Sequence, residues 1–310
     1  MLINLKVKKT IFIAVLLFCL TPVIDAQLAL ILGIIVVNSV GNPFQSQTNE
    51  SIKWLLKFAI VGLGFGMNFY SAVNTGKQGF LFTFIIILLV FCLGWFLSKI
   101  LKIDSKTSLL VSAGTAICGG SAIAAVAPIL EVDAKKISVA LGTVFVLNAV
   151  ALLIFPIIGF YFELTQYQFG LWSATAIHDT SSVVGAASKY GSEALEVATT
   201  IKLGRALWII PLSILVAIFN KKTNSKINIP YFIGFFIVAM LINTFLPEFK
   251  EYYSSIVLLS KKALVVTLFL IGTSLSLETI KSVGFKTFIQ GVVLWLTISI
   301  LSLIAIIYLY

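Results

Sequence analysis

Five consecutive polar residues interrupt an apolar stretch in the second half of the chain. His178 and Asp179 are followed by three hydroxyl residues, Thr180, Ser181 and Ser182. A buried carboxylate tends to be neutral unless it is paired, and an imidazole titrates near neutral pH. Asp179 and His178 are therefore candidates for binding a coupling ion, a proton or sodium, and the hydroxyl residues are candidates for binding substrate. The alternatives are a fixed His–Asp pair that ties helices together, or a segment that meets water.

A second candidate segment, residues 114–128, reads GTAICGGSAIAAVAP. Each of its adjacent glycines weakens a helix by about 1 kcal/mol relative to alanine, and Pro128 removes a backbone hydrogen bond. Such a segment can break inside a membrane and present backbone N–H groups to an anion. The alternative is close helix packing through small residues. The predicted substrate-binding residues of this segment are Cys118, Gly119, Gly120 and Ser121.

Two basic residues, Lys202 and Arg205, lie one helical turn apart before Trp208 and Pro211. At this spacing both side chains point to one helix face. The planar fork of arginine suits oxyanions, so we expect both residues to bind an anionic substrate. The alternative is that both extend toward the membrane interface as anchors.

Five further polar residues lie within apolar stretches and are weaker candidates for lining a transport pathway. Each could equally make one hydrogen bond between helices, which is the commoner case. These residues are Asn38, Asn68, Asn148, Thr273 and Ser274.

The elements that must position these residues are membrane helices. Of the 310 residues, 59% are hydrophobic and only 11% are charged, whereas soluble domains carry about 25% charged residues. Only helices and closed barrels satisfy the backbone inside a bilayer. Apolar runs such as residues 82–97 are continuous, whereas barrel strands alternate apolar and polar residues. The composition therefore predicts an all-α, polytopic membrane protein.

A bilayer core requires about 20 apolar residues per helix, and this template predicts 10 or 11 spans. The longest polar loops, such as 43–52 and 221–229, are too short for a soluble domain, so residues 1–310 are predicted to form one membrane domain. Residues 1–26 are either a first short helix or a signal-like segment. The predicted spans are 10–26, 27–42, 53–74, 79–98, 107–130, 136–160, 168–190, 201–220, 230–246, 256–279 and 285–309.

Charge predicts the orientation and the partners. Lysines are more frequent in the loops that share a side with the N-terminus, which predicts a cytoplasmic N-terminus in the cell membrane. We interpret the formal charge of +10 as loop anchoring at the lipid bilayer, not as nucleic-acid binding. Three cysteines within apolar runs and a single histidine give no disulfide or metal-ligand pattern. We therefore expect neither a metal nor another cofactor.

Two internal similarities are present. Residues 115–121, TAICGGS, resemble residues 175–181, TAIHDTS, and residues 64–69, GFGMNF, resemble residues 270–275, LIGTSL. In the predicted topology the second pair runs in opposite directions through the membrane, as an inverted repeat requires. The first pair runs in the same direction and does not fit that symmetry. The sequence leaves open which similarity marks a repeat.

Four stretches of the chain, each of which contains candidate residues described above, resemble the sulfate exporter family of bacterial membrane proteins, also called YeiH-like. They are ILGIIVVN at 31–38, GTAICGGSAIAAVAPI at 114–129, FGLWSATAIHDTSSVVGAA at 169–187 and IKLGRALWIIP at 201–211. The resemblance covers most of the chain. It implies a distant similarity to the cation/proton antiporter and bile-acid symporter superfamily, with inverted repeats, broken crossing helices and an elevator-like motion.

One departure from the family pattern bears on specificity. Many similar sequences read His-Glu-Val-Ala-Gln where this chain has residues 178–182, His-Asp-Thr-Ser-Ser. The acid is kept but shortened, and hydroxyls replace other side chains. The choice of substrate or coupling ion is expected to differ accordingly.

The expected function is a secondary transporter, and by resemblance an exporter, of a small anion such as sulfate or a sulfonate. No P-loop is present in the sequence, so a proton or sodium gradient is the expected energy source. A homodimer is compatible with transporters of this kind. A passive channel is an alternative, and so is an intramembrane hydrolase built on His178, Asp179 and Ser181, although no G-x-S-x-G elbow occurs. The expectation is that the protein is not an enzyme.

Overall fold

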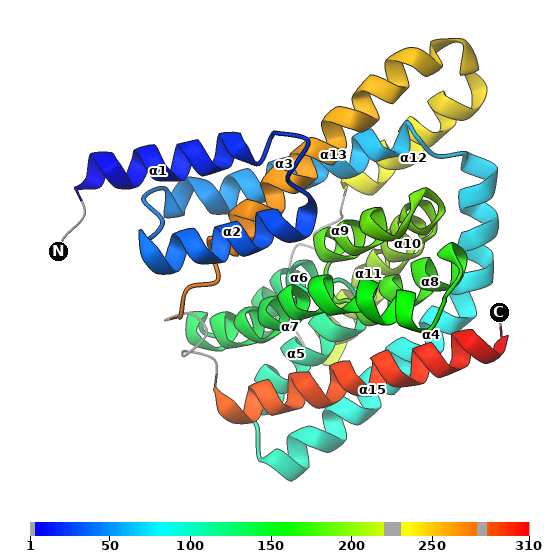
Figure 1. Ribbon diagram of the computed structural model, residues 1–310. Helices are drawn as coiled ribbons and strands as arrows, with labels where there is room; N and C mark the ends of the chain where they lie inside the picture. Colours follow the sequence, from blue (N-terminus) through cyan, green and yellow to red (C-terminus); the bar gives the residue numbers. More distant parts are fainter. Residues whose placement is uncertain (1–3, 220–230, 278–283, 310) are drawn as a thin grey trace. The chain divides into compact units, whose positions relative to one another are not determined.

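Every regular element that the computed structural model describes is helical. The described residues are 4–219, 231–277 and 284–309, and no strand occurs within them (Figure 1). The predicted all-α fold class is confirmed. The helices are α1 (Leu5–Phe18), α2 (Ala26–Ser39), α3 (Gln45–Gly64), α4 (Phe69–Leu101), α5 (Ser105–Ala116), α6 (Gly120–Leu130), α7 (Ala134–Tyr161), α8 (Gln166–Ala176), α9 (Thr180–Tyr190), α10 (Ser192–Ala206), α11 (Ile209–Phe219), α12 (Tyr231–Phe245), the 3-10 helix η1 (Pro247–Phe249), α13 (Lys250–Gly272) and α15 (Phe285–Leu309).

Several helices are long and apolar enough to cross a bilayer. Large apolar side chains on them, such as Trp95, Ile157 and Phe285, are exposed, as expected for surfaces that contact lipid. Among the described residues five stretches qualify, or six if α3 and the start of α4, which meet at a bend of 106°, form one span. The chain is therefore a polytopic membrane protein. The five stretches are Gly79–Leu101, Lys136–Tyr161, Ser192–Phe219, Pro247–Gly272 and Phe285–Leu309.

Three predicted spans contain a break of three or four residues, and the span 201–220 contains a shorter one at residues 207–208, between α10 and α11. The predicted spans 107–130 and 168–190 are interrupted at residues 117–119 and 177–179, and the span 53–74 is interrupted at residues 65–68. Hydropathy alone does not register these interruptions, because the glycine and hydroxyl residues around them are compatible with an apolar average.

Other predicted spans differ in their ends. The spans predicted at 10–26 and 27–42 correspond to α1 and α2, helices of only 14 residues. The span predicted at 201–220 begins at Ser192 and is 28 residues long, so Lys202 and Arg205 lie near its middle and not at its start. The span predicted at 256–279 is α13, which begins earlier and ends at Gly272. The predicted loop 221–229 lies outside the described residues.

Contacts divide the chain into two compact units. Unit 1 comprises Met1–Val73 and Tyr231–Thr279, and unit 2 comprises Asn74–Pro230 and Ile280–Tyr310. Each unit combines segments that are far apart in the sequence.

Unit 1 contains one helix arrangement twice. At the end of α13, a Cβ added to Gly272 would overlap the carbonyl oxygen of Leu30 in α2. At the end of α3, a Cβ added to Gly64 would lie 2.8 Å from the carbonyl oxygen of Phe236 in α12. In this comparison α2 corresponds to α12, and α3 corresponds to α13. The segment α2–α3 is thus repeated as the segment α12–α13.

The turns that follow α3 and α13 are each held by an asparagine from the partner helix. Asn243 of α12 donates from Nδ2 to the carbonyl oxygen of Met67 at 3.0 Å, and Asn38 of α2 donates from Nδ2 to that of Leu275 at 3.4 Å. Each carbonyl belongs to the third residue after the last glycine of its helix. The segments 64–69 and 270–275 therefore lie at equivalent helix ends, but the structural alignment is shifted by two residues from the predicted one, because Gly64 and not Gly66 corresponds to Gly272.

The two copies run in opposite directions. α3 and α13 pack against each other and are antiparallel in Figure 1. A Cβ on Gly62 would contact Ser260, and one on Gly66, farther along α3, would contact Val257, which is earlier in α13. Unit 1 therefore contains an inverted repeat of two helices, as the predicted architecture requires.

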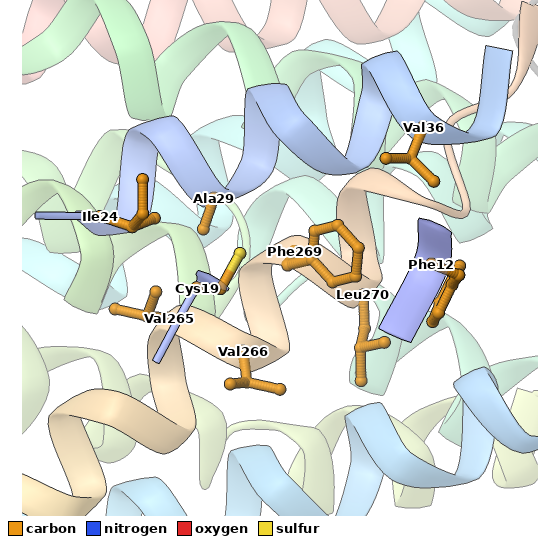
Figure 2. Close-up of a cluster of buried hydrophobic side chains, with 9 residues drawn as sticks. All are labelled: Phe12, Cys19, Ile24, Ala29, Val36, Val265, Val266, Phe269 and Leu270. Atoms are coloured by element: carbon orange, nitrogen blue, oxygen red, sulfur yellow. The ribbon is translucent and has the colours of Figure 1, made fainter. Parts of the chain in front are cut away.

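The core of unit 1 is formed by α1, α2 and α13 (Figure 2). The ring of Phe12 lies 5.4 Å from that of Phe269, in an edge-to-face arrangement. Lys262 of α13 donates from Nζ to the carbonyl oxygen of Thr21, just after α1, at 2.5 Å. This contact satisfies a backbone acceptor near the C-terminal end of a short helix.

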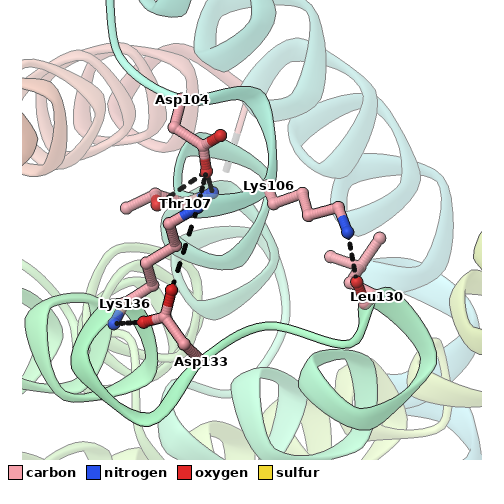
Figure 3. Close-up of polar contacts among 6 residues, drawn as sticks. All are labelled: Asp104, Lys106, Thr107, Leu130, Asp133 and Lys136. Carbon is pink, nitrogen blue, oxygen red and sulfur yellow. Dashed lines mark hydrogen bonds and ion pairs between the residues drawn. The ribbon is translucent and has the colours of Figure 1, made fainter.

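In unit 2, one polar network fixes the beginnings of α5 and α7 (Figure 3). The carboxylate of Asp104 caps α5, accepting from the backbone N–H of Thr107 at 3.1 Å and from its hydroxyl at 3.0 Å. Lys136 of α7 lies 3.1 Å from the same carboxylate. Lys106 donates to the carbonyl oxygen of Leu130 at the end of α6, at 2.7 Å. These contacts join the beginning of α5 to the beginning of α7 and to the end of α6. They thereby connect the helices before and after the break at residues 117–119.

Gly272→Ala is expected to lower the free energy of unfolding by about 1–3 kcal/mol, because the added methyl group overlaps a backbone oxygen and an overpacked core must shift. The measurement is the unfolding midpoint of the protein in detergent. Gly234→Ala in α12 is the matched control, since its added Cβ would have nothing within 4 Å. Equal midpoints for the two variants would contradict the close packing of α13 on α2.

Asp104 is expected to stabilise the folded protein at neutral pH and to lose this effect in acid. Burial alone raises the pKa of Asp104, but hydrogen bonds from Thr107 and Lys136 and the charge of Lys136 outweigh burial and lower it. A carboxyl group with a lowered pKa stabilises the fold above its unfolded pKa of about 3.9, and this stabilisation is lost as the pH falls through the lowered value. Below about pH 4, the unfolding midpoint of the wild type is therefore expected to fall more steeply than that of Asp104→Asn, which retains a capping oxygen. Glu50→Gln, at an exposed glutamate, should follow the wild type, and parallel curves for all three proteins would disprove the role of Asp104.

Candidate functional site: two helix interruptions in unit 2

The first interruption follows α5. The N–H of Gly119 donates to the carbonyl oxygen of Gly114 at 2.8 Å, which closes a wide turn and ends the helix. Gly119 has φ +66°, a conformation that L side chains rarely adopt, and a Cβ there would lie 3.0 Å from the Cβ of Asp179. Glycine is thus required both for the backbone geometry and for the close approach of the two interruptions. α6 begins at the next residue.

The second interruption follows α8. The backbone N–H of His178 donates to the side-chain oxygen of Asn148 in α7 at 3.0 Å. Asp179 is the N-cap of α9, and its carboxylate accepts from the N–H of Ser182 at 2.7 Å. Both α5 and α8 end on the sequence Thr-Ala followed by Ile, so the similarity between residues 115–121 and 175–181 marks two equivalent helix ends. The structure brings these ends together.

Arg205 joins the C-terminal ends of α5 and α8. Its Nε donates to the carbonyl oxygen of Ala116 at 2.5 Å, and its Nη1 donates to that of Thr175 at 2.5 Å. Longer bonds of 3.3 Å and 3.4 Å reach the carbonyl oxygens of Ala174 and Thr115. The last carbonyls of a helix have no partner within it, and one guanidinium fork supplies a donor to both helices. Arg205 is the only arginine of the chain.

Lys202 caps the second helix end from the preceding turn of α10. Its Nζ donates to the carbonyl oxygen of Ile177 at 2.7 Å and to that of Ala174 at 3.3 Å. Lys202 and Arg205 are 0% and 1% exposed. Interface anchoring, which requires the charged end to reach water, is therefore wrong for this pair. No carboxylate of the described residues lies within 4.0 Å of either side chain.

The fixed charges around the interruptions do not cancel when Lys202 is protonated. The N-terminal ends of α6 and α9 carry about half a positive charge each, and the C-terminal ends of α5 and α8 carry about half a negative charge each. These helix-end charges offset one another. Lys202 and Arg205 then add two positive charges against the one negative charge of Asp179, so that a surplus of about one positive charge is buried in unit 2.

The two helix N-termini differ in their occupancy. That of α9 already holds an anion, the carboxylate of Asp179. That of α6 follows Gly119, which has no side chain, and the groups that interact there are neutral: the side chain of Cys118 with the backbone N–H of Ala122 and with Ser121. Ser121 at this end is exposed and Gly120 is partly buried. The N-terminus of α6 is therefore the end that an external anion can approach.

Several buried polar atoms around the interruptions lack hydrogen-bond partners within the described part of the chain. Both ring nitrogens of His178 are unpartnered, as are the side-chain NH2 of Asn148 and the hydroxyl of Thr115. Buried polar groups usually find partners. These atoms thus provide unused donors and acceptors for water, an ion or a substrate.

The predicted site residues are distributed between the units as follows. The residues predicted from the two central motifs and the basic pair all lie at or next to the interruptions, together with Asn148 from the weaker group. Three other weak candidates lie in unit 1 and make local or interhelical hydrogen bonds: Asn38 binds the turn after α13, Asn68 caps the start of α4, and Thr273 accepts from Asn42. The hydroxyl of Ser274, also in unit 1, lies 3.4 Å from the carbonyl oxygen of Leu270.

The backbone carbonyls of residues 115–116 and 174–177 were not predicted as part of the site. Sequence patterns of side chains do not register them, since any residue supplies a carbonyl. The available signal was the repeated Thr-Ala-Ile together with a single arginine. Within the described residues, no group of three or more His, Cys, Asp or Glu side chains is arranged to hold a metal ion.

Comparison with known proteins relates this chain to a family of membrane proteins. The family model described as Conserved hypothetical protein 698 matches residues 10–291. The UPF0324 membrane protein of Bacteroides thetaiotaomicron is 51% identical over 290 residues, which cover 92% of this chain and 87% of that protein. The UPF0324 membrane protein of Photobacterium profundum is 47% identical over 300 residues, covering 97% and 92%.

A third relative, the UPF0324 membrane protein of Porphyromonas gingivalis, is 50% identical over 288 residues, covering 92% of this chain and 86% of that protein. No solved structure matches the chain. The names of these relatives identify them as membrane proteins but name no substrate. The resemblance to sulfate exporters and to the antiporter superfamily therefore stays a prediction.

Arg205→Lys is expected to destabilise the protein strongly, by about 3–5 kcal/mol, as when one partner of a buried charged contact is removed. A single ammonium group does not have the fork that reaches both helix ends. The measurement is the unfolding midpoint in detergent, with Lys77→Ala, at an exposed lysine, as the control. An Arg205→Lys protein as stable as the control would show that the guanidinium bridge does not hold the two ends together.

Proposed function

The chain belongs to the membrane-protein family described as Conserved hypothetical protein 698, and on that premise we propose that it is a secondary transporter of a small anion. The proposed energy source is a proton or sodium gradient. Transport by alternating access, with an elevator-type movement of one unit relative to the other, is part of the proposal. The division of the chain into two compact units supports it.

One observation carries the proposal. The N-terminus of α6, whose N-cap residue Gly119 has no side chain and which holds no carboxylate, begins next to an interruption whose preceding helix end is bound by a buried arginine. A helix N-terminus binds anions through its N–H groups and its dipole. When Lys202 is protonated, the surplus positive charge at the interruptions has no carboxylate of the described residues within 4.0 Å of the Lys202 or Arg205 side chain. An anion at this position offsets a charge that is costly to bury in a membrane.

The residues have distinct proposed roles. Gly119, Gly120 and Ser121 receive the anion at the start of α6, while Lys202 and Arg205 supply the positive field from the opposite helix ends. Cys118 and the hydroxyl residues 180–182 border the same place. A sulfate or a sulfonate fits the proposed binding groups, because both present several acceptor oxygens to N–H donors.

Asp179 is the proposed coupling residue. Its carboxylate contacts the N–H of Ser182 and closely approaches Gly119. Loss of its negative charge by protonation, or its pairing with a sodium ion, increases the positive field at the neighbouring anion site. Anion affinity and coupling-ion binding are thereby linked, as a coupled transporter requires. His178, with an unpartnered ring, is the second candidate for carrying a proton.

The hydrolase alternative lacks the required pairing. A hydrolytic set needs a nucleophile hydrogen-bonded to a base, and the ring of His178 has no hydrogen-bond partner among the described residues. Ser181 is therefore not paired with it. A passive channel stays an alternative that transport measurements distinguish, because a channel produces no accumulation against a gradient.

The test is uptake of labelled sulfate, sulfite and taurine into proteoliposomes under proton and sodium gradients. The wild type is expected to accumulate one of these anions. Asp179→Asn is expected to keep exchange of the anion across the membrane but to lose its dependence on the gradient. Asn still caps a helix, so the variant removes the charge while retaining a capping oxygen.

Asp133→Asn is the matched control, since Asp133 is also a helix N-cap, accepting from the N–H of Lys136 at the start of α7. It is expected to behave as the wild type. Absence of flux for all of these anions under either gradient would refute the proposed function. Flux with unchanged gradient dependence in Asp179→Asn would place the coupling group elsewhere.

A further inference from the structure

A cavity lies beside the basic pair of α10, within unit 2. Its volume is about 330 Å3, and it is formed between α4 and the helices α10 and α11. This volume is at the lower end of the range for sites that bind small molecules, about 300–1,000 Å3. Most of its wall is apolar, and Arg205 belongs to that wall.

Two glycines give the cavity its space. A Cβ added to Gly76 in α4 or to Gly204 in α10 would have nothing within 4 Å. Gly79, one turn after Gly76, instead lets α4 approach α10 so closely that a Cβ there would overlap Ile201. The helices are thus in contact on one side of the cavity and separated on the other, and no side chain of either open glycine fills the gap.

The apolar part of the wall is aromatic. The ring of Trp208 lies 5.6 Å from that of Phe80 and 5.4 Å from that of Phe84, both in tilted arrangements. Phe80 and Trp208 line the cavity. Aromatic faces of this kind bind apolar groups with large contact area.

The polar part of the wall is small and positively charged. Thr200 lines the cavity, and its buried hydroxyl has no partner among the described residues. Arg205 lies one and a half turns farther along α10 and carries the fixed positive charge. The donors of its guanidinium contact the carbonyls of α5 and α8, so it is the charge, together with the hydroxyl of Thr200, that faces an occupant. A positive group and a hydroxyl in an apolar cavity are complementary to an amphipathic anion.

We propose that the substrate is an organic anion, a sulfonate or carboxylate with a short alkyl or aryl group, whose apolar part occupies the cavity and whose anionic head lies toward Arg205. This inference rests on the proposed function and specifies its substrate class. Residues 119–121 at the start of α6 do not line the cavity, so the cavity is proposed as a second binding position for the same anion. A fully hydrated inorganic anion uses none of the aromatic wall. A neutral lipid chain uses the wall but leaves the positive charge of Arg205 without a partner.

The first experiment compares ligands on the whole protein in lipid nanodiscs. Alkanesulfonates of increasing chain length, from methanesulfonate to hexanesulfonate, are titrated while the unfolding midpoint is recorded. Each added methylene is expected to tighten binding about fourfold until the cavity is filled. Alkanols of the same lengths, which lack the charge, are expected to bind much more weakly. Equal binding of alkanols and alkanesulfonates would identify a site for hydrocarbon chains and overturn the proposal.

The second experiment fills the cavity. Gly204→Leu places a side chain into open space, and it is expected to abolish the dependence of binding on chain length. Gly234→Leu in α12 is the matched control, because its Cβ also meets nothing within 4 Å but lies in unit 1. An undiminished dependence on chain length in Gly204→Leu overturns the proposal, and its loss in both variants does so as well.

The outcomes separate this inference from the proposed function. If labelled sulfate is transported but alkanesulfonates neither compete with it nor show a dependence on chain length, the substrate class is wrong and anion transport stands. If alkanesulfonates bind with the expected dependence, and Gly204→Leu removes it, while no anion crosses the membrane, the site stands as a ligand site and transport is wrong.

Discussion

A helix that breaks inside a membrane leaves carbonyl groups without partners, and lipid offers none. In this protein two helices, α5 and α8, end in this way within one unit, and the single arginine of the chain donates to both ends. The broken geometry depends on this contact. Without a donor of fixed charge and planar shape, the carbonyl groups of Ala116 in α5 and Thr175 in α8 would be buried unsatisfied, at a cost of several kcal/mol.

The same contact creates the conditions for ligand binding. Because α5 and α8 stop, α6 and α9 must start, and two helix N-termini lie next to the interruptions. The carboxylate of Asp179 caps one of them, and Gly119 gives the other no charged cap. This asymmetry between otherwise similar segments, TAICGGS and TAIHDTS, distinguishes a helix end that already contains an anion from the one that we propose as the anion site. The contacts of Lys202 and Arg205 with the carbonyls of these helix ends explain why a basic pair is tolerated at full burial, and in the proposed function the same two residues supply the positive field for the anion.

Unit 1 shows how a repeated sequence pattern becomes a repeated structure. Glycine at the ends of α3 and α13 allows backbone contact with α12 and α2, and an asparagine from each partner helix binds the turn that follows. Hydrogen bonds of this kind specify helix register, because their donors and acceptors have few other partners in a membrane. The polar residues of unit 1 that resemble pathway residues in sequence thus have a structural explanation.

The sequence by itself determined the class of protein and which residues form the candidate site. Continuous apolar runs and a low fraction of charged residues leave helices in a membrane as the consistent solution, and polar or glycine-rich segments within such runs are costly enough to indicate function. Residues 118–121, 178–182, Lys202 and Arg205 were identified on this basis. The helix interruption predicted within residues 114–128 is present at residues 117–119.

Only the tertiary structure decided how these residues are used. The sequence does not reveal that Lys202 and Arg205 lie in the middle of a span, because the preceding residues 192–200 are polar enough to resemble a loop. It does not reveal that their partners are backbone carbonyls, since carbonyls are the same in every residue. The cavity beside Arg205 is formed where Gly76 of α4 and Gly204 of α10 leave space between their helices. The separation of two helices depends on how they pack, and no local sequence pattern encodes it.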